Sequence, residues 1–198
     1  MKTNSKHLGL VTKKFNEFFF VDLKNKENFG NSERFLCKVR KSINFKDQFI
    51  YVGDEVEIDN IDLTTKRAVI ASLKKRQNLL NRPSVANISN IYITFSVEEP
   101  KLNLSQVNRF LISAESMGVE VSLVLTKCDL ISDKKQIFLL DKFKKWGYQA
   151  ITLNLEKSDH FEDLLAELKK KKCSIFMGPS GVGKTTLLNM IIPGLQNS

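Results

Sequence analysis

Hydrophobic and polar positions follow different patterns in the first and second parts of the chain. Up to residue 72, short apolar runs alternate with polar turns, and no helical period persists. We expect strands at 17–23, 34–39, 49–52, 55–59 and 67–72. Short strands at this density favour a small closed β-barrel of the OB type.

Beyond this region, strands and helices alternate along the chain. We expect strands at 90–95, 119–125, 150–153 and 173–177, and helices at 104–117, 134–146, 161–168 and 184–192. Ser158 or Asp159 is expected to cap the third helix. Such alternation predicts a parallel sheet covered by helices. The fold class is therefore α/β, with a barrel domain at 1–72, a linker at 73–83 and an α/β domain at 84–198.

A glycine-rich segment joins the last predicted strand to the last predicted helix. It consists of Gly178, Pro179, Ser180, Gly181, Val182, Gly183, Lys184 and Thr185, and it matches the phosphate-binding P-loop. Glycines let the backbone turn its N–H groups toward phosphates. Lys184 would then reach the β- and γ-phosphates, Thr185 would bind Mg²⁺, and Thr186 would contact the α-phosphate.

A second motif follows the strand predicted at 119–125. It consists of Thr126, Lys127, Cys128 and Asp129. Guanine-binding proteins commonly place such a segment after a strand, where the aspartate accepts hydrogen bonds from the base and the lysine lies over it. Because a mismatched base leaves buried polar groups unpaired, this arrangement rejects adenine. The pair Lys127 and Asp129 therefore argues against an ATP-dependent kinase or transporter and favours GTP.

The order of the two motifs is reversed relative to ordinary GTPases, because the base-reading motif precedes the P-loop by about fifty residues. This order indicates a circularly permuted GTPase domain. Together with segments 52–56, 76–87, 108–111 and 178–189, it resembles the ribosome small subunit-dependent GTPase A family from roughly residue 10 to residue 192.

The resemblance implies a function and a set of partners. We expect a cytoplasmic, monomeric GTPase that acts in late maturation of the small ribosomal subunit, contacts ribosomal RNA through its OB-fold and is stimulated by the subunit. The family also holds zinc through cysteines and a histidine in a C-terminal domain, and those ligands are absent here. The alternative is a catalytically impaired RNA-binding protein with a vestigial guanine-nucleotide site.

Three departures from the family pattern bear on activity. Thr126 stands where asparagine is usual, which predicts weaker but retained guanine selectivity. Asn154 and Leu155 replace a Ser-Ala pair near the guanine carbonyl, where a backbone N–H could still serve. No Asp-x-x-Gly segment and no switch threonine occur in the sequence, which would lower the rate of phosphoryl transfer by orders of magnitude. We expect either an N-terminal fragment or a natural truncation whose sheet lacks two strands.

Composition supports a polyanionic partner. The formal net charge is +9, with 31 lysines and arginines against 22 acids. In the linker, Lys74, Lys75, Arg76 and Arg82 are the better candidates for phosphate contacts, whereas the lysine run 169–172 fits a solvated helix end.

Of the barrel phenylalanines Phe15, Phe18, Phe20, Phe35, Phe45 and Phe49, we expect one or two to face RNA. Trp146 is expected to serve packing.

The remaining signals exclude other classes of protein. The cysteines Cys37, Cys128 and Cys173 are too widely spaced for a zinc site and are expected to be reduced thiols. The N-terminus does not resemble a signal peptide, and no run is long enough to span a membrane. We therefore expect a soluble, intracellular protein.

Overall fold

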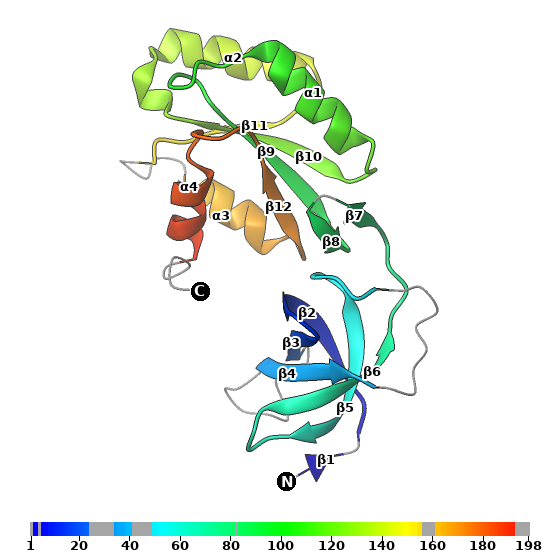
Figure 1. Cartoon of the computed structure of the whole chain (residues 1–198). Coiled ribbons are helices and arrows are strands. Elements are labelled where there is room, and N and C mark those ends of the chain that lie inside the picture. Colours follow the sequence, from blue (N-terminus) through cyan, green and yellow to red (C-terminus); the bar gives the residue numbers. More distant parts are fainter. Residues whose placement is uncertain are drawn as a thin grey trace. The chain divides into compact units, whose positions relative to one another are not determined.

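The computed structural model describes residues 2–3, 5–23, 34–40, 49–81, 83–155 and 161–192. The chain divides into two compact units, residues 1–88 and 89–198, each with its own sheet (Figure 1). Strands and helices below carry the labels of Figure 1. The predicted domain limits at 72 and 84 stay a prediction.

The first unit is a small barrel. Its strands are β1 (Lys2–Thr3), β2 (His7–Phe15), β3 (Phe18–Leu23), β4 (Arg34–Val39), β5 (Glu55–Asp62) and β6 (Arg67–Leu73). They pair in the order β1-β5-β2-β3-β4-β6, and the further pairing of β5 with β6 closes β2 to β6 on themselves. β4 runs parallel to β6, and the other pairs are antiparallel. The predicted OB-type barrel is confirmed.

One predicted strand in this unit was wrong, and one long strand was not predicted. Residues 49–52 form no strand, because Val52 makes only an isolated bridge with Val85. The nine-residue strand β2 was missed. Gly9 and the lysines at its end disguise the alternation, and a register shift between Val11 and Lys13 breaks it within the strand.

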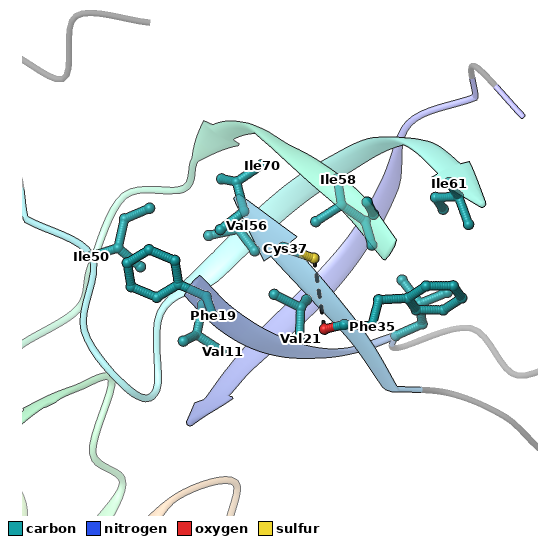
Figure 2. Close-up of a cluster of buried hydrophobic side chains, with 12 residues drawn as sticks. Val11, Phe19, Val21, Phe35, Cys37, Ile50, Val56, Ile58, Ile61 and Ile70 are labelled. Atoms are coloured by element: carbon teal, nitrogen blue, oxygen red, sulfur yellow. Dashed lines mark hydrogen bonds between the residues drawn. The ribbon is translucent and has the colours of Figure 1, made fainter. Parts of the chain in front are cut away.

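The barrel interior is filled by alternate residues of its strands. Figure 2 shows aliphatic and aromatic side chains from several strands turned toward one another. The fully buried members are Val11, Val21, Phe35, Cys37, Val56, Ile58, Ile61 and Ile70. Burial raises the pKa of the Cys37 thiol to about 12, so it stays protonated at neutral pH and behaves as a small apolar side chain. Phe45 lies outside the described residues, while Phe15 and Phe49 are exposed.

Asp54 fixes the segment that follows the barrel. Its buried carboxylate accepts hydrogen bonds from Arg76 Nε at 2.6 Å and from the Tyr51 backbone N–H at 2.8 Å. Gly53 is left-handed, and a Cβ there would lie 2.0 Å from the carbonyl oxygen of Ala86. This close approach requires glycine.

A hairpin of β7 (Leu79–Asn81) and β8 (Ser84–Ala86) spans the end of the predicted linker and the start of the predicted α/β domain. The side-chain amide of Asn78 bonds both the N–H and the carbonyl of Ile88, which ties the start of the hairpin to its end. Of the cations predicted to contact phosphate, Arg76 is committed to Asp54 and Lys74 pairs with Glu57 at 2.5 Å. Arg82 lies outside the described residues.

The second unit is a parallel sheet with the strand order β11-β10-β9-β12. The strands are β9 (Asn90–Ser96), β10 (Glu120–Thr126), β11 (Ala150–Thr152) and β12 (Ser174–Met177). The helices are α1 (Leu104–Glu115), α2 (Asp133–Lys145), α3 (Phe161–Lys169) and α4 (Lys184–Ile191). The predicted alternation is confirmed to within a few residues at each boundary. The expected cap of α3 at Ser158 or Asp159 lies outside the described residues.

Helices cover both faces of this sheet. α1 and α2 lie on one face, and α3 and α4 lie on the other (Figure 1). Leu164 of α3 and Leu187 of α4 pack with Tyr92 and Val124 of the strands. Every residue of β9 is buried, as expected for a central parallel strand covered on both faces. The carboxyl ends of the strands therefore share one edge, where ligands bind in open α/β sheets.

Candidate functional site

The P-loop begins where β12 ends at Met177 and closes at the first turn of α4. A Cβ at Gly178 would lie 2.1 Å from the carbonyl oxygen of Thr94 on β9, so the loop crosses the central strand at contact distance. Gly181 and Gly183 have left-handed backbones, with φ of 80° and 89°. These glycines are needed for the curl of the loop.

The lysine of the loop turns back over its own backbone. Lys184 Nζ donates hydrogen bonds to the carbonyl oxygens of Gly178 at 2.9 Å and Pro179 at 2.5 Å. Partial burial lowers the pKa of Lys184, because desolvation disfavours the charged amine. The ammonium is thus held at the carbonyl oxygens of the loop's first two residues.

The other loop residues divide into buried and exposed positions. Val182 is buried, as is Leu187 one turn into α4, and both hold the loop to the unit. Ser180, Thr185 and Thr186 are exposed, so the two threonine hydroxyls at the start of α4 are accessible. A helix N-terminus with exposed N–H and hydroxyl donors favours an anion.

The base-reading motif begins at the end of β10. The buried Thr126 hydroxyl donates a 2.6 Å hydrogen bond to the carbonyl oxygen of Val182 in the P-loop. Lys127 has a left-handed backbone, and its ammonium donates to the carbonyl of Glu99. The two motifs therefore meet directly, although about fifty residues separate them in the sequence.

Cys128 and Asp129 open a short 3-10 helix, Cys128–Leu130. Cys128 is buried, its thiol donates to the Leu125 carbonyl at 3.3 Å, and desolvation raises its pKa to about 11. The thiol is therefore protonated at neutral pH. Asp129 is exposed, so its carboxylate is available to a ligand.

Two further segments line this edge of the sheet and contact the P-loop. The sequence motifs predicted neither contact. A methyl group of Leu155, just after β11, lies 3.0 Å from the Cβ position of Gly183. In the loop after β9, Pro100 Cδ lies 3.7 Å from the Cβ position of Gly181, and Ser96 Oγ donates to the Pro100 carbonyl at 2.7 Å. In the sequence, these segments could have been recognised only by their position directly after a predicted parallel strand.

In the part of the chain that the structure describes, no cluster of three or more His, Cys, Asp or Glu side chains could hold a metal ion. Among the same residues, no helix is both long and apolar enough to cross a membrane.

Comparisons with known proteins agree with this architecture. A family model described as RsgA GTPase matches residues 73–198. The small ribosomal subunit biogenesis GTPase RsgA of Prochlorococcus marinus (strain NATL1A) is 38% identical over 197 residues, covering 96% of this chain and 63% of that protein. Its counterpart in Parasynechococcus marenigrum (strain WH8102) is 33% identical over 191 residues, covering 96% and 64%.

Two solved structures are similar over most of the chain. YjeQ from Thermotoga maritima has a TM-score of 0.84 at 31% identity, covering 96% of this chain and 66% of that one. YloQ, described as a circularly permuted GTPase, has a TM-score of 0.80 at 25% identity, covering 96% and 65%. The chain thus spans a little under two thirds of the length of these relatives.

Proposed function

We propose, since the chain belongs to the RsgA GTPase family, that it binds GTP and GDP with Mg²⁺ and acts as a GTPase in maturation of the small ribosomal subunit in the cytoplasm. GTPases of this kind generally use Mg²⁺ with GTP. The observation that carries the proposal is the hydrogen bond from Thr126 to Val182, because it brings a base-reading motif and a phosphate loop to one edge of one sheet.

The roles of the base-reading residues follow from their chemistry. The exposed carboxylate of Asp129 would accept hydrogen bonds from N1–H and the 2-amino group of guanine. The Lys127 stem would lie along the base, with its ammonium held at the Glu99 carbonyl. Adenine offers neither donor in this pattern, so Asp129 would be left unpaired against it.

The phosphate-binding residues have equally separable roles. Backbone N–H groups of 178–183 would cradle the phosphates, and the Lys184 ammonium would move from the loop carbonyls to the β- and γ-phosphate oxygens. The exposed Thr185 hydroxyl fits Mg²⁺, which takes few protein ligands and completes its shell with phosphate oxygens and water. When bound, the metal would neutralise phosphate charge. Thr186 would contact the α-phosphate.

The ribosomal part of the proposal rests on the family and on the barrel. The relatives are named as small ribosomal subunit biogenesis GTPases. Phe15 and Phe49 are exposed on the barrel unit, in keeping with one or two aromatic side chains facing RNA. We propose that this unit contacts ribosomal RNA and that the protein acts as a monomer.

Nucleotide preference is the first test. Titrations of GDP and ADP into the purified chain, with and without Mg²⁺, should show GDP binding at least about a hundredfold tighter than ADP. Lys184→Ala should abolish measurable binding, whereas Lys170→Ala, which removes an exposed lysine of the same unit, should leave it unchanged. Equal binding of ADP and GDP would refute the proposal.

Asp129→Asn gives a sharper test of the base contact. The substitution replaces a carboxylate acceptor by an amide donor, which suits the 2-carbonyl of xanthine instead of the 2-amino group of guanine. Preference should shift from GDP toward xanthosine diphosphate. Asp133→Asn, at an exposed aspartate nearby in the sequence, is the matched control and should keep GDP preference.

Hydrolysis is tested separately from binding. Phosphate release from GTP should rise when small ribosomal subunits are added and should vanish in Lys184→Ala. GDP binding together with subunit binding, but with no turnover, would favour the alternative of an RNA-binding protein with a vestigial nucleotide site.

A further inference from the structure

Helix α2 carries aromatic and cationic side chains on one outward face. Lys134, Phe138, Lys142 and Lys145 are spaced three or four residues apart, and Trp146 follows one turn after Lys142. We call these five residues the α2 surface. The inner face of the helix is formed by Leu139 and Phe143, which are buried against the unit.

Both aromatic members of this surface are open to solvent. Phe138 is 62% exposed and Trp146 is 37% exposed. Lys142 Nζ lies 5.9 Å from the ring centre of Phe138 and 5.6 Å from that of Trp146, within range of both rings. The Trp146 ring also packs edge-on against buried Phe143, with ring centres 5.5 Å apart. The surface therefore presents two flat rings beside one cation, and the Trp146 ring is also packed against the unit.

The charges of this helix are only partly balanced. α2 contains five lysines against two aspartates, and its ion pairs are Lys135 with Glu98 at 2.6 Å and Lys145 with Asp141 at 2.7 Å. Within the described residues, Lys134, Lys142 and Lys144 have no carboxylate partner. The surface therefore favours an anionic partner.

Flat rings beside uncompensated lysines suit unpaired RNA, because bases stack on the rings while the lysines neutralise phosphates. A second copy of this chain is a poor partner, since each copy carries a net charge of +9. The lysine run 169–172 lacks these features: Lys171 is paired with Glu120 at 2.5 Å, and no cation–ring contact of the described residues involves the run.

We propose that the α2 surface is a docking site for single-stranded RNA on the GTPase unit, with Phe138 as the stacking platform and Lys134 and Lys142 as phosphate contacts. The inference rests on the proposed function and deepens it, since it names a surface for the RNA partner on the second unit in addition to the barrel. It does not require nucleotide hydrolysis.

The test uses the whole chain and a fluorescein-labelled oligouridylate, with binding followed by anisotropy at several salt concentrations. Phe138→Ala should weaken binding about tenfold, the loss expected when one base loses its stacking partner. The double variant Lys134→Gln/Lys142→Gln should lower the slope of log K against log salt by about 0.7 for each lysine. All three positions lie on the helix surface, and an unchanged thermal midpoint would confirm that the variants fold.

A matched control removes the same charge elsewhere. Lys170→Gln/Lys172→Gln, in the exposed part of the lysine run, should change affinity less than twofold. Trp146 is the only tryptophan of the chain, so its emission should change with the same midpoint as the anisotropy. Both results together would support the α2 surface.

Three outcomes would overturn the inference. One is equal loss in the two double-lysine variants, which would mean unspecific attraction to net charge. Another is oligouridylate binding without any change in Trp146 emission, which would place the RNA elsewhere. The third is binding to phosphatidylserine vesicles, lost in Phe138→Ala, with no oligouridylate binding. A GDP titration on the same preparations keeps the tests separate, because loss of GDP binding bears on the nucleotide site alone.

Discussion

The Thr126 hydroxyl donates a 2.6 Å hydrogen bond to the carbonyl oxygen of Val182, a residue 56 positions later in the chain, and so joins the two motifs. Both residues are buried, so the bond is shielded from water and its loss would leave the carbonyl without this donor. The contact explains how threonine can occupy the first position of the base-reading motif: its short side chain still reaches the phosphate loop.

Thr126→Val removes this hydroxyl while keeping the shape of the side chain. We expect the free energy of unfolding to fall by about 1–3 kcal/mol, the cost of a buried acceptor left unpaired. GDP should bind about tenfold more weakly, because the loop is no longer held to β10. Urea unfolding and GDP titration measure the two effects. Thr126→Ser keeps the hydroxyl and should retain most of the stability and most of the GDP affinity. Equal losses in the two variants would contradict a role for the hydroxyl.

Gly178→Ala should disrupt the P-loop. The added Cβ would lie 2.1 Å from the Thr94 carbonyl oxygen, which belongs to the central strand and cannot move aside. We expect a loss of more than about 3 kcal/mol in unfolding free energy and loss of GDP binding. Gly147→Ala separates this clash from backbone strain, since Gly147 is left-handed but has nothing within 4 Å of its Cβ position. Gly147→Ala should lower the free energy of unfolding by about 1–2 kcal/mol and leave GDP binding unchanged.

Arg76→Met should destabilise the barrel unit strongly. Asp54 is 0% exposed, and Arg76 bonds both of its carboxylate oxygens, at 2.6 and 2.7 Å. Removing the guanidinium leaves a buried carboxylate without its cation, which lowers the free energy of unfolding by about 3–5 kcal/mol. The surface pair of Arg34 with Asp22 has similar geometry in an exposed setting, so Arg34→Met should cost less than about 1 kcal/mol. Similar urea midpoints for the two variants would show that burial does not set the cost.

Glu57 should contribute to the acid sensitivity of the barrel. Hydrogen bonds from Lys74 and Ser72 lower its pKa from 4.5 to about 2. A carboxyl group whose pKa is lower in the folded state stabilises the fold above pH 4.5, and this contribution disappears as the pH falls toward 2. The stability difference between the wild-type chain and Glu57→Gln should therefore shrink over this range. Thermal midpoints of the two proteins, measured between pH 4.5 and 2, test this. A constant difference between them would show that Glu57 does not cause the acid sensitivity.

Local pattern was sufficient for most of the secondary structure. The alternation of apolar runs with amphipathic segments predicted the parallel sheet, because β9 must be apolar throughout to be buried on both faces. The pattern failed at β2, where a bulge interrupts the alternation, and at 49–52, where an apolar run supports a turn held by Asp54. In both places long-range pairing decides the structure, and periodicity carries no information about it.

Residue types and their order along the chain were enough to predict the chemistry of the candidate site: a P-loop, a base-reading motif and their reversed order, which led to the family. The folded chain adds three contacts that no local pattern indicates: Thr126 bonds Val182, Leu155 and Pro100 lie against P-loop glycines, and Arg76 pairs with Asp54. The physical reason is that residue types fix what a side chain can bond. Strand order and backbone closure then fix which partners come within reach.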